Sequence, residues 1–402
     1  MRMAYVCADP GIPVFGCKGA SVHVQEVLRG LLKQGVDVTL IAQRFDGEPP
    51  AGLEGLKCLA LPPLPRGSAL ERAQGALTAG HAALRSALQS LAPLDWVYER
   101  YSLWSDAGMA YAREQGIPGL LEVNAPLIEE QRTHRELPLE HEARRVAQSV
   151  FADATAMIAV SPGVKQYLQA QGAEPQRVQV VANGVDPARF ATAAAGRAGR
   201  MARRAHDSGA EPAVIGFLGT LKPWHGLPTL VQAFERLHRQ YPHTRLLVVG
   251  DGPEQAAIRA DLVARGLEAH VRFAGAVEPA QVPGWLAQMD VAVAPYPQLA
   301  EFYFSPLKIY EYMAAGLPVV ATRVGHLESV VLHGETGLLV PPQQPEQMAE
   351  AIAQLLNDPA QQARMGHNGR RLAEQERSWD AVVQRIVHTM RTTPLQPPRP
   401  LA

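Results

Sequence analysis

One segment in the second half of the chain has the residue types and spacing needed to bind a nucleoside diphosphate. It is Ser305-Pro-Leu-Lys-Ile-Tyr-Glu-Tyr-Met-Ala-Ala-Gly-Leu-Pro-Val-Val320. A helix is expected to open at Pro306, so the N–H groups of Leu307 and Lys308 would be unpaired and could hold a phosphate. Glu311, one turn further on, could accept hydrogen bonds from ribose hydroxyls. A charged Glu in an otherwise apolar helix needs a partner, which would be a ligand or, as the alternative, another side chain.

Two glycine-rich loops could support the same chemistry. Gly219-Thr-Leu-Lys-Pro-Trp-His-Gly226 follows an apolar run and precedes a helical pattern. Its glycines allow backbone N–H groups to approach an anion, and Lys222 and His225 can add positive side chains. Gly250-Asp-Gly-Pro253 also follows an apolar run. As an alternative, a plain turn between a strand and a helix would account for the residues of the first loop. A purely structural turn accounts for Gly250 and Gly252 of the second loop nearly as well as a ligand does.

The first half of the chain has one comparable loop, Lys18-Gly-Ala-Ser-Val-His23, after its first apolar run. Gly19 would allow close approach of a ligand there. The chain contains no GxGxxG, GxxxxGK[ST], HExxH, CxxC or GxSxG pattern and no Asp-x-Asp. These absences argue against an NAD enzyme and against a metal-dependent sugar transferase of one domain, and we expect no metal site.

Short apolar runs alternate with longer helical patterns along the chain, which predicts parallel sheets built from βαβ units. The expected strands are Met3–Ala8, Val36–Ala42, Trp96–Glu99, Gly119–Glu122, Ala156–Val160, Val178–Val181, Val214–Leu218, Arg245–Val249, Val271–Ala274, Val291–Ala294, Val319–Ala321 and Leu338–Val340. Helices are expected over Ala69–Leu91, Leu227–Arg239 and Leu307–Ala315, and within Pro345–Met390.

A stretch rich in Ala, Gly and Arg interrupts this alternation and divides the chain into two α/β halves. We expect an acceptor-binding domain over residues 1–190, a linker or exposed loop over 191–212, a nucleotide-binding domain over 213–390 and a disordered Pro-rich tail over 391–402. The linker contains Arg197, Arg200, Arg203 and Arg204, which are expected to be solvated, with an acidic acceptor or an anionic lipid as the alternative partner.

Composition supports an ordinary globular protein. The 402 residues are 47% hydrophobic and 19% charged, with a net charge of -1, so nothing calls for nucleic acid as a partner. The three cysteines form no paired spacing, and no stretch approaches the about 20 apolar residues of a membrane span. We expect a cytoplasmic protein, with peripheral docking on the inner face of a membrane left open.

The chain resembles the family 4 retaining glycosyltransferases, which have the GT-B fold, two Rossmann-like domains facing each other across a cleft. The likeness covers roughly residues 3–390. It is carried by GASVHVQEVLRGLLKQGVDV, VANGVDPARF, FLGTLKPWHG, LVVGDGP, VRFAGAV, DVAVAPY, SPLKIYEYMAAGLPVVAT and GETGLLVPP, in that order.

The resemblance implies transfer of a hexose, with retention of configuration, from a nucleoside diphosphate sugar to a hydroxyl acceptor. A UDP-sugar is favoured and GDP-mannose is next, no metal or other cofactor is required, and the acceptor is a saccharide or a lipid-linked compound. Lys222, Lys308 and Glu311 would act directly on the donor. The other implied donor-site residues are Gly19, Gly219, Thr220, His225, Gly250, Gly252, Gly275, Tyr303, Ser305 and Leu307. His23 and Asn124 would contact the acceptor.

Some positions depart from the family pattern. Tyr303 stands where an earlier glutamate usually helps to hold the donor sugar, and Pro306 replaces a glycine. Thr220 and His225 replace the Arg and Lys of the phosphate loop. Asn124 stands where a histidine is common. These departures leave two alternatives open, a non-catalytic protein that binds nucleotide sugars and a UDP-sugar epimerase of the same fold.

Overall fold

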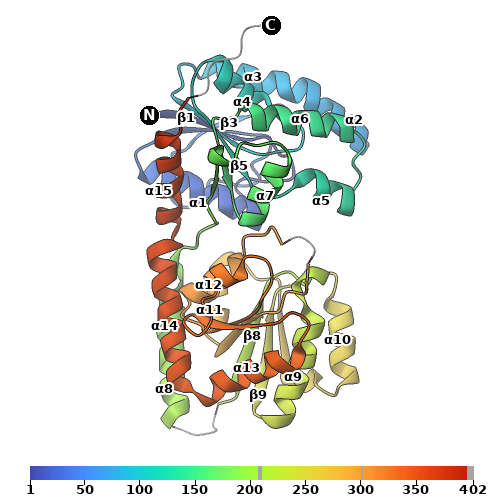
Figure 1. Cartoon of the computed structure of the whole chain (residues 1–402), viewed down its shortest axis with the longest axis vertical. Coiled ribbons are helices and arrows are strands. Elements are labelled where there is room, and N and C mark those ends of the chain that lie inside the picture. The colour runs from blue at the N-terminus through green and yellow to red at the C-terminus, as the bar shows by residue number, and fades with distance from the viewer. Residues whose placement is uncertain (207–210, 300–301, 396–402) are drawn as a thin grey trace. The chain divides into compact units, whose positions relative to one another are not determined.

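The computed structural model describes residues 1–206, 211–299 and 302–395 (Figure 1). The chain forms two compact units, which are treated separately below. Unit 1 consists of Met1–Asn183, Tyr303–Ser305 and Trp379–Ala402, and unit 2 of Gly184–Phe302 and Pro306–Ser378.

Unit 1 is built on a sheet of seven parallel strands in the order β3-β2-β1-β4-β5-β6-β7. The strands are β1 (Arg2–Cys7), β2 (Asp37–Ala42), β3 (Lys57–Ala60), β4 (Trp96–Arg100), β5 (Gly119–Val123), β6 (Ala156–Ala159) and β7 (Val178–Val180). Six of them match the expected apolar runs. The edge strand β3 was not expected, because its mostly exposed residues lack a continuous apolar run.

Helices cover both faces of this sheet. One face packs against α1 (Gly19–Lys33) and the C-terminal helix α15 (Trp379–Thr392), which run side by side in Figure 1. The other face packs against helices from the middle of the unit. The remaining helices of unit 1 are α2 (Ala69–Gly75), η1 (Ala76–Gly80), α3 (His81–Ser90), α4 (Ala107–Glu114), α5 (Leu127–His134), α6 (Glu140–Asp153), α7 (Pro162–Ala170) and η2 (Pro175–Arg177).

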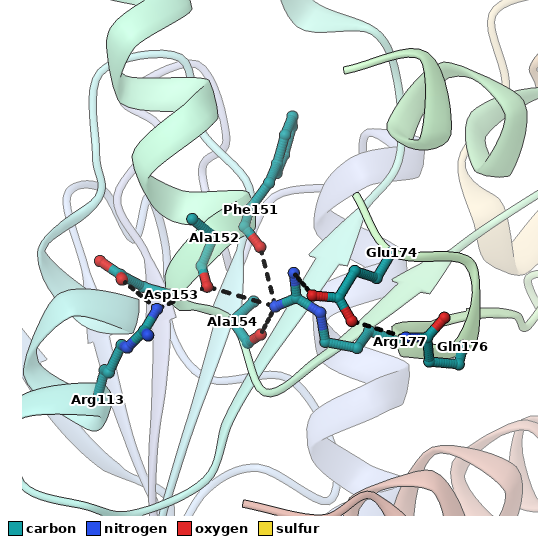
Figure 2. Close-up of polar contacts among 8 residues, drawn as sticks. All are labelled: Arg113, Phe151, Ala152, Asp153, Ala154, Glu174, Gln176 and Arg177. Carbon is teal, nitrogen blue, oxygen red and sulfur yellow. Dashed lines mark hydrogen bonds and ion pairs between the residues drawn. The ribbon is translucent and has the colours of Figure 1, made fainter. Parts of the chain in front are cut away.

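Two arginines complete the C-terminus of α6 (Figure 2). The guanidinium of Arg177 donates to the carbonyl oxygens of Phe151, Ala152 and Ala154 at 3.4, 3.3 and 2.9 Å. Arg113 donates to the Ala152 carbonyl at 2.9 Å and pairs with Asp153. The last carbonyls of a helix have no partner within the helix, so these contacts stabilise the turn that leads into β6.

Unit 2 is built on a sheet of six parallel strands in the order β10-β9-β8-β11-β12-β13, the strand order of Rossmann domains. The strands are β8 (Ala213–Leu218), β9 (Thr244–Val249), β10 (Val271–Gly275), β11 (Val291–Ala294), β12 (Val319–Thr322) and β13 (Gly337–Val340). The helices are η3 (Pro187–Phe190), α8 (Ala191–His206), η4 (Pro223–His225), α9 (Leu227–Gln240), α10 (Gln255–Ala264), η5 (Glu268–His270), η6 (Pro279–Gln281), α11 (Val282–Leu286), α12 (Leu307–Ala314), η7 (Leu327–Ser329), α13 (Pro345–Asn357) and α14 (Pro359–Glu376).

The structure differs from the expected domain boundaries in two places. Residues 191–206, expected as part of a linker or exposed loop, form α8, and Arg197 is buried with its Nη1 donating to the Gly316 carbonyl at 2.6 Å. Helix α15, expected in the second domain, belongs to unit 1, because Trp379 and Val383 pack into that unit's core. Residues 207–210 of the expected loop and 396–402 of the expected tail lie outside the described residues.

Within the described ranges, no helix combines the length and the apolar character that crossing a membrane would require.

Candidate active site

The carboxyl edge of the unit 2 sheet opens between β8 and β11, where the strand order reverses. The two strands are paired only at Val291–Ile215 and Ala292–Gly216. Beyond that point the hydroxyl of Tyr312, on α12, accepts the Leu218 N–H at 2.7 Å and donates to the Val293 carbonyl at 3.3 Å. Tyr312 therefore joins α12 to both strands, at the place where open parallel sheets bind ligands.

Three glycines are required here, either by a positive φ or by contacts between loops. Gly219 and Gly250 have φ values of 139° and 136°, which favour glycine. A Cβ at Gly250 would lie 2.0 Å from the Gly219 carbonyl oxygen, and one at Gly252 would lie 2.5 Å from the Leu221 carbonyl oxygen. The packing of the loops after β8 and β9 explains Gly250 and Gly252 without a ligand. Gly275, at the end of β10, has a φ of 74° and accepts a hydrogen bond from the Gly250 N–H at 2.9 Å.

Lys308, the second residue of α12, carries a buried amine at this edge. The residue is 8% exposed, and its Nζ has no hydrogen-bond partner within the part of the chain that the structure describes. Nζ lies 4.3 Å from the Phe217 ring centre, 5.2 Å from that of Tyr296, and 2.8 Å from the position of a Cβ at Gly219. Burial lowers the pKa of Lys308 to about 7, although Glu311 acts in the opposite direction. Such an amine is well placed to receive an anion.

His225 and Lys222, which the sequence predicted to bring positive charge to the loop Gly219–Gly226, are less favourably placed than Lys308. Burial and the charge of Lys308 lower the pKa of His225 to about 4, so this ring is neutral at pH 7, contrary to the expectation that it adds charge. Its Nδ1 contacts the Thr220 carbonyl, while the Thr220 residue itself is exposed. Lys222 is half-buried, with its Nζ 5.6 Å from the centre of the Trp224 ring. Of the three side chains predicted to bring positive charge to the donor site, Lys308 is the most buried.

Glu311 lies one turn after Lys308 and is half-buried. Burial raises the pKa of this carboxyl to about 7, and the charges of Arg189 and Lys308 oppose the shift. Arg189 is held by a 2.9 Å hydrogen bond from its Nη2 to the Pro279 carbonyl. Sequence reasoning missed Arg189, although it lies in the VANGVDPARF segment. Leu307 begins α12, as expected, after Pro306 at the N-cap.

Arginines also fix the other end of α12. Arg370 donates to the Ala314 carbonyl at 2.7 Å, and Arg197 donates to the Gly316 carbonyl just beyond the helix. Together with Tyr312, these contacts hold α12, and with it Lys308 and Glu311, against the sheet. No motif marked Arg197 or Arg370, because each is distant in sequence from the helix that it completes.

Tyr303 and Ser305 do not lie in unit 2. The Tyr303 hydroxyl donates to Glu130 Oε1 at 2.6 Å, and the Tyr303 carbonyl accepts from Ser161 Oγ at 2.6 Å. Ser305 Oγ accepts the Asn183 N–H at 3.2 Å. The hydroxyl of Tyr303 is thus engaged with a carboxylate of unit 1.

The residues predicted for the acceptor also lie in unit 1. His23 is buried in α1, with its Nε2 bonded to Glu122 Oε1, and Asn124 is half-buried and donates to the same oxygen at 3.3 Å. Gly19 is the first residue of α1. The structure therefore brings His23 and Asn124 together on one carboxylate, which sequence reasoning had not singled out.

Two family models match the chain. The model described as Glycosyltransferase Family 4 matches residues 18–189, and the model described as Glycosyl transferases group 1 matches residues 212–358. The first match falls within unit 1 except at its end, and the second lies in unit 2 apart from the short segment Tyr303–Ser305.

Curated relatives agree with these matches. A D-inositol 3-phosphate glycosyltransferase of Kineococcus radiotolerans is 32% identical over 96% of this chain and 92% of the relative. A protein of the same name from Corynebacterium urealyticum is 31% identical over 64% of this chain and 62% of the relative, so that match leaves over a third of the relative uncovered. A GDP-mannose-dependent alpha-(1-6)-phosphatidylinositol monomannoside mannosyltransferase of Mycobacterium tuberculosis is 32% identical over 52% of this chain and 54% of the relative.

Among solved structures, Anabaena HepE in complex with UDP and glucose is similar with a TM-score of 0.70. The sequence identity is 19%, and the alignment covers 98% of this chain and 100% of that one. At this identity the likeness concerns the fold, two Rossmann-like domains of the GT-B class, as the sequence predicted.

Proposed function

Because the chain belongs to the family 4 glycosyltransferases, we propose that it moves a hexosyl group from a nucleoside diphosphate sugar to a hydroxyl acceptor, with retention of configuration. The observation that carries this proposal is the unpaired amine of Lys308, buried at the carboxyl edge of the unit 2 sheet beside a helix N-terminus. A diphosphate would supply the missing hydrogen-bond acceptors and the opposite charge.

A UDP-sugar is our preferred donor, with GDP-mannose as the alternative. UDP is supported by the complex of the similar Anabaena protein, and GDP-mannose by the name of the mycobacterial relative. The inositol phosphate and phosphatidylinositol compounds in the relatives' names make a hydroxylated ring a reasonable acceptor.

The roles of the donor-site residues follow from their positions. Lys308 and the N–H groups of Leu307 and Lys308 would neutralise the diphosphate as it leaves, which is stabilisation by preorganised charge. Glu311 would accept hydrogen bonds from the ribose, and Lys222 would act from the edge of the loop. We propose no metal ion in this scheme, since Lys308 and the helix N-terminus supply positive charge.

Calorimetric titration with UDP, GDP and ADP, each with and without magnesium, tests the donor site. We expect one nucleotide to bind without metal in the wild type and to bind much more weakly in Glu311→Ala. Unchanged binding in that variant, or no binding of any nucleotide to the wild type, would overturn the assignment.

The replacement of a glutamate by Tyr303 keeps a non-catalytic binding protein as the second candidate. The Tyr303 hydroxyl donates to Glu130 Oε1 of unit 1. Release of UDP from a UDP-sugar in the presence of an acceptor separates the two, because a binding protein would hold the nucleotide and release none. The epimerase alternative requires a new UDP-sugar to form without any acceptor, which a parallel reaction mixture lacking the acceptor reveals.

A further inference from the structure

Two histidines meet at the amino edge of the unit 2 sheet, at the opposite end of the strands from Lys308. His238 lies in the last turn of α9, and His270 is the last residue of η5, directly before β10. Both residues are half-buried. Their ring centres are 4.1 Å apart and their planes are inclined by 38°, so the two imidazoles are in direct contact.

A chain of two hydrogen bonds fixes where the neutral His238 ring carries its hydrogen. Thr244 Oγ1 donates its only hydrogen to the Tyr241 carbonyl at 2.8 Å, so the same oxygen accepts from Nδ1 of His238 at 3.2 Å. The neutral ring therefore has its hydrogen on Nδ1, and a second proton would add to Nε2. Thr244 is 2% exposed and begins β9, so this bond also ties the end of α9 to the start of β9.

The environment of His270 favours the neutral ring as well. Its Nδ1 is buried and has no hydrogen-bond partner within the ranges that the structure describes. A neutral imidazole can keep a lone pair on this atom and its hydrogen on Nε2. A protonated imidazole has a hydrogen on both nitrogens, so Nδ1 would become a buried donor without an acceptor, which is costly.

The charges around the pair oppose protonation of His238. Burial lowers the pKa of His238, and the charges of His270 and Arg245 lower it further, against the hydrogen bond to Thr244. Arg245 is fixed on β9, where its Nη1 donates to the Thr244 carbonyl at 2.9 Å. The other charged side chains of the packed elements are paired with one another or exposed, namely Glu235 and Arg239 on α9, Asp261 and Arg265 at the end of α10, and Glu268 on η5.

We propose that His238 and His270 form an acid-sensitive contact, which holds the end of α9 against β9 and η5 only while at most one of the two rings is protonated. Two cationic imidazoles at this separation repel each other, so acidification opens the contact. The elements that meet here lead, at their other ends, to Gly226, Gly250 and Gly275. The inference concerns the stability of unit 2 and does not depend on the proposed function.

Titration of the full chain with ¹³C-labelled histidine, followed by NMR of the ring Cε1–H groups, tests whether the two rings interact. His238 should take up its proton below the ordinary value of 6.5, and this step should also shift the His270 resonance. In His270→Phe, which keeps a ring at the contact but removes its charge, His238 should titrate at a higher pH than in the wild type. Identical titration of His238 in the two proteins would overturn the proposal.

Hydrogen exchange followed by mass spectrometry tests whether acid opens the contact. Between 6.5 and the lowered pKa of His238, the unfolded chain binds more protons than the folded chain, so stability falls as the pH falls. Peptides covering residues 232–245 and 266–275 should therefore lose protection between about pH 7.5 and pH 5.5, after correction for the intrinsic exchange rate. The loss should be smaller in His270→Phe, by at most about tenfold per pH unit, which is the limit for one proton.

His243→Asn is the matched control. His243 is exposed in the turn between α9 and β9, and its backbone carbonyl accepts the Ala213 N–H at 3.1 Å, a bond that the substitution keeps. This variant should lose protection on acidification as the wild type does.

A second variant, His270→Asn, removes the ring and should behave as His270→Phe does. The same acid-dependent loss of protection in the wild type and in both His270 variants would show that the pair has no part in acid sensitivity. A loss spread equally over every peptide of unit 2 would also overturn the proposal, because the opening would then not be local.

Discussion

The Nζ atom of Lys308 lies 4.3 Å from the centre of the Phe217 ring and has no hydrogen-bond partner among the residues described. An amine over an aromatic face gains some attraction from the ring, but this contact does not replace the hydrogen bonds lost on burial. The position is therefore costly in the free protein and favourable once an anion is bound. This relationship leads to three predictions about Lys308.

Replacing Lys308 by Met should weaken nucleotide binding without destabilising the fold. Loss of a hydrogen bond to a charged group costs about 1.5–3 kcal/mol, or about 10- to 100-fold in affinity. An apolar side chain of similar length removes an unpaired buried amine, so the melting temperature should stay constant or rise. Calorimetry and thermal unfolding measure the two effects. Lys222→Met, at a half-buried position, is the control and should change nucleotide affinity less. An equal loss of affinity in both variants would show that Lys308 contributes no more to binding than Lys222 does.

Nucleotide affinity should depend on pH through the Lys308 amine. Its pKa of about 7 in the free protein means that it loses its proton as the pH rises through 7, and the diphosphate must then bind a neutral group. Affinity should therefore fall between about pH 7 and pH 9, with more proton uptake on binding in the wild type than in Lys308→Met. Titrations in buffers of different ionisation enthalpy measure this uptake, and equal uptake in the two proteins would contradict the prediction.

The same amine should make the folded protein more stable as the pH rises, whereas it makes nucleotide affinity fall. Between pH 7 and the ordinary lysine pKa, the unfolded chain binds more protons at this group than the folded chain does. The contribution of Lys308 therefore makes the free energy of unfolding rise with pH over that window. Urea unfolding of the wild type and of Lys308→Met at several pH values isolates this contribution of Lys308. A parallel pH dependence in both proteins would show that the amine keeps its ordinary pKa.

Changing Glu311 to Ala should strongly reduce nucleotide affinity and turnover while leaving the fold intact. The carboxyl is half-buried near Arg189 and Lys308, and its proposed partners are ribose hydroxyls. Glu350→Ala, on the exposed surface of α13 in the same unit, is the matched control. Kinetics of nucleotide release and calorimetry measure the effect. Wild-type kinetics in Glu311→Ala would remove this residue from the site.

The Tyr312 hydroxyl should contribute to both stability and binding. In Tyr312→Phe the buried Leu218 N–H loses its acceptor, which costs about 1–3 kcal/mol of unfolding free energy. Nucleotide affinity should fall as well, because α12 loses its bonds to β8 and β11. Tyr241→Phe removes an exposed bond to Asn357 and should cost less. Denaturant unfolding compares the two, and equal stability of both variants would show that Tyr312 does not hold the helix.

Removing the Tyr303 hydroxyl should leave nucleotide affinity unchanged. That hydroxyl donates to Glu130 within unit 1, so Tyr303→Phe should lower thermal stability slightly and affect UDP titrations little. A marked loss of UDP affinity would mean that Tyr303 binds the donor directly, as its place in the family pattern suggested.

Local patterns in the sequence predicted the sheets well. Apolar runs such as Val214–Leu218 and Val291–Ala294 coincide with β8 and β11 to within a residue, because strands buried on both faces are continuous in hydrophobicity. The start of α12 at Leu307 was predicted from Pro306. The placement of Lys308 and Glu311 in the first turns of this helix was predicted from their spacing after Pro306. Strand β3 was not predicted, because an exposed edge strand has no continuous apolar run.

The sequence by itself determined the two α/β halves, the family and the segment that carries Lys308 and Glu311, since these depend on periodicity and on short motifs. Only the tertiary structure decided that Lys308 is buried without a hydrogen-bond partner in the described ranges, that His225 is neutral and that Tyr303 contacts Glu130. It also joined His238 to His270 and Arg197 to the end of α12. Burial and pairing depend on residues distant in the chain, and a pKa depends on both, so no local pattern contains them.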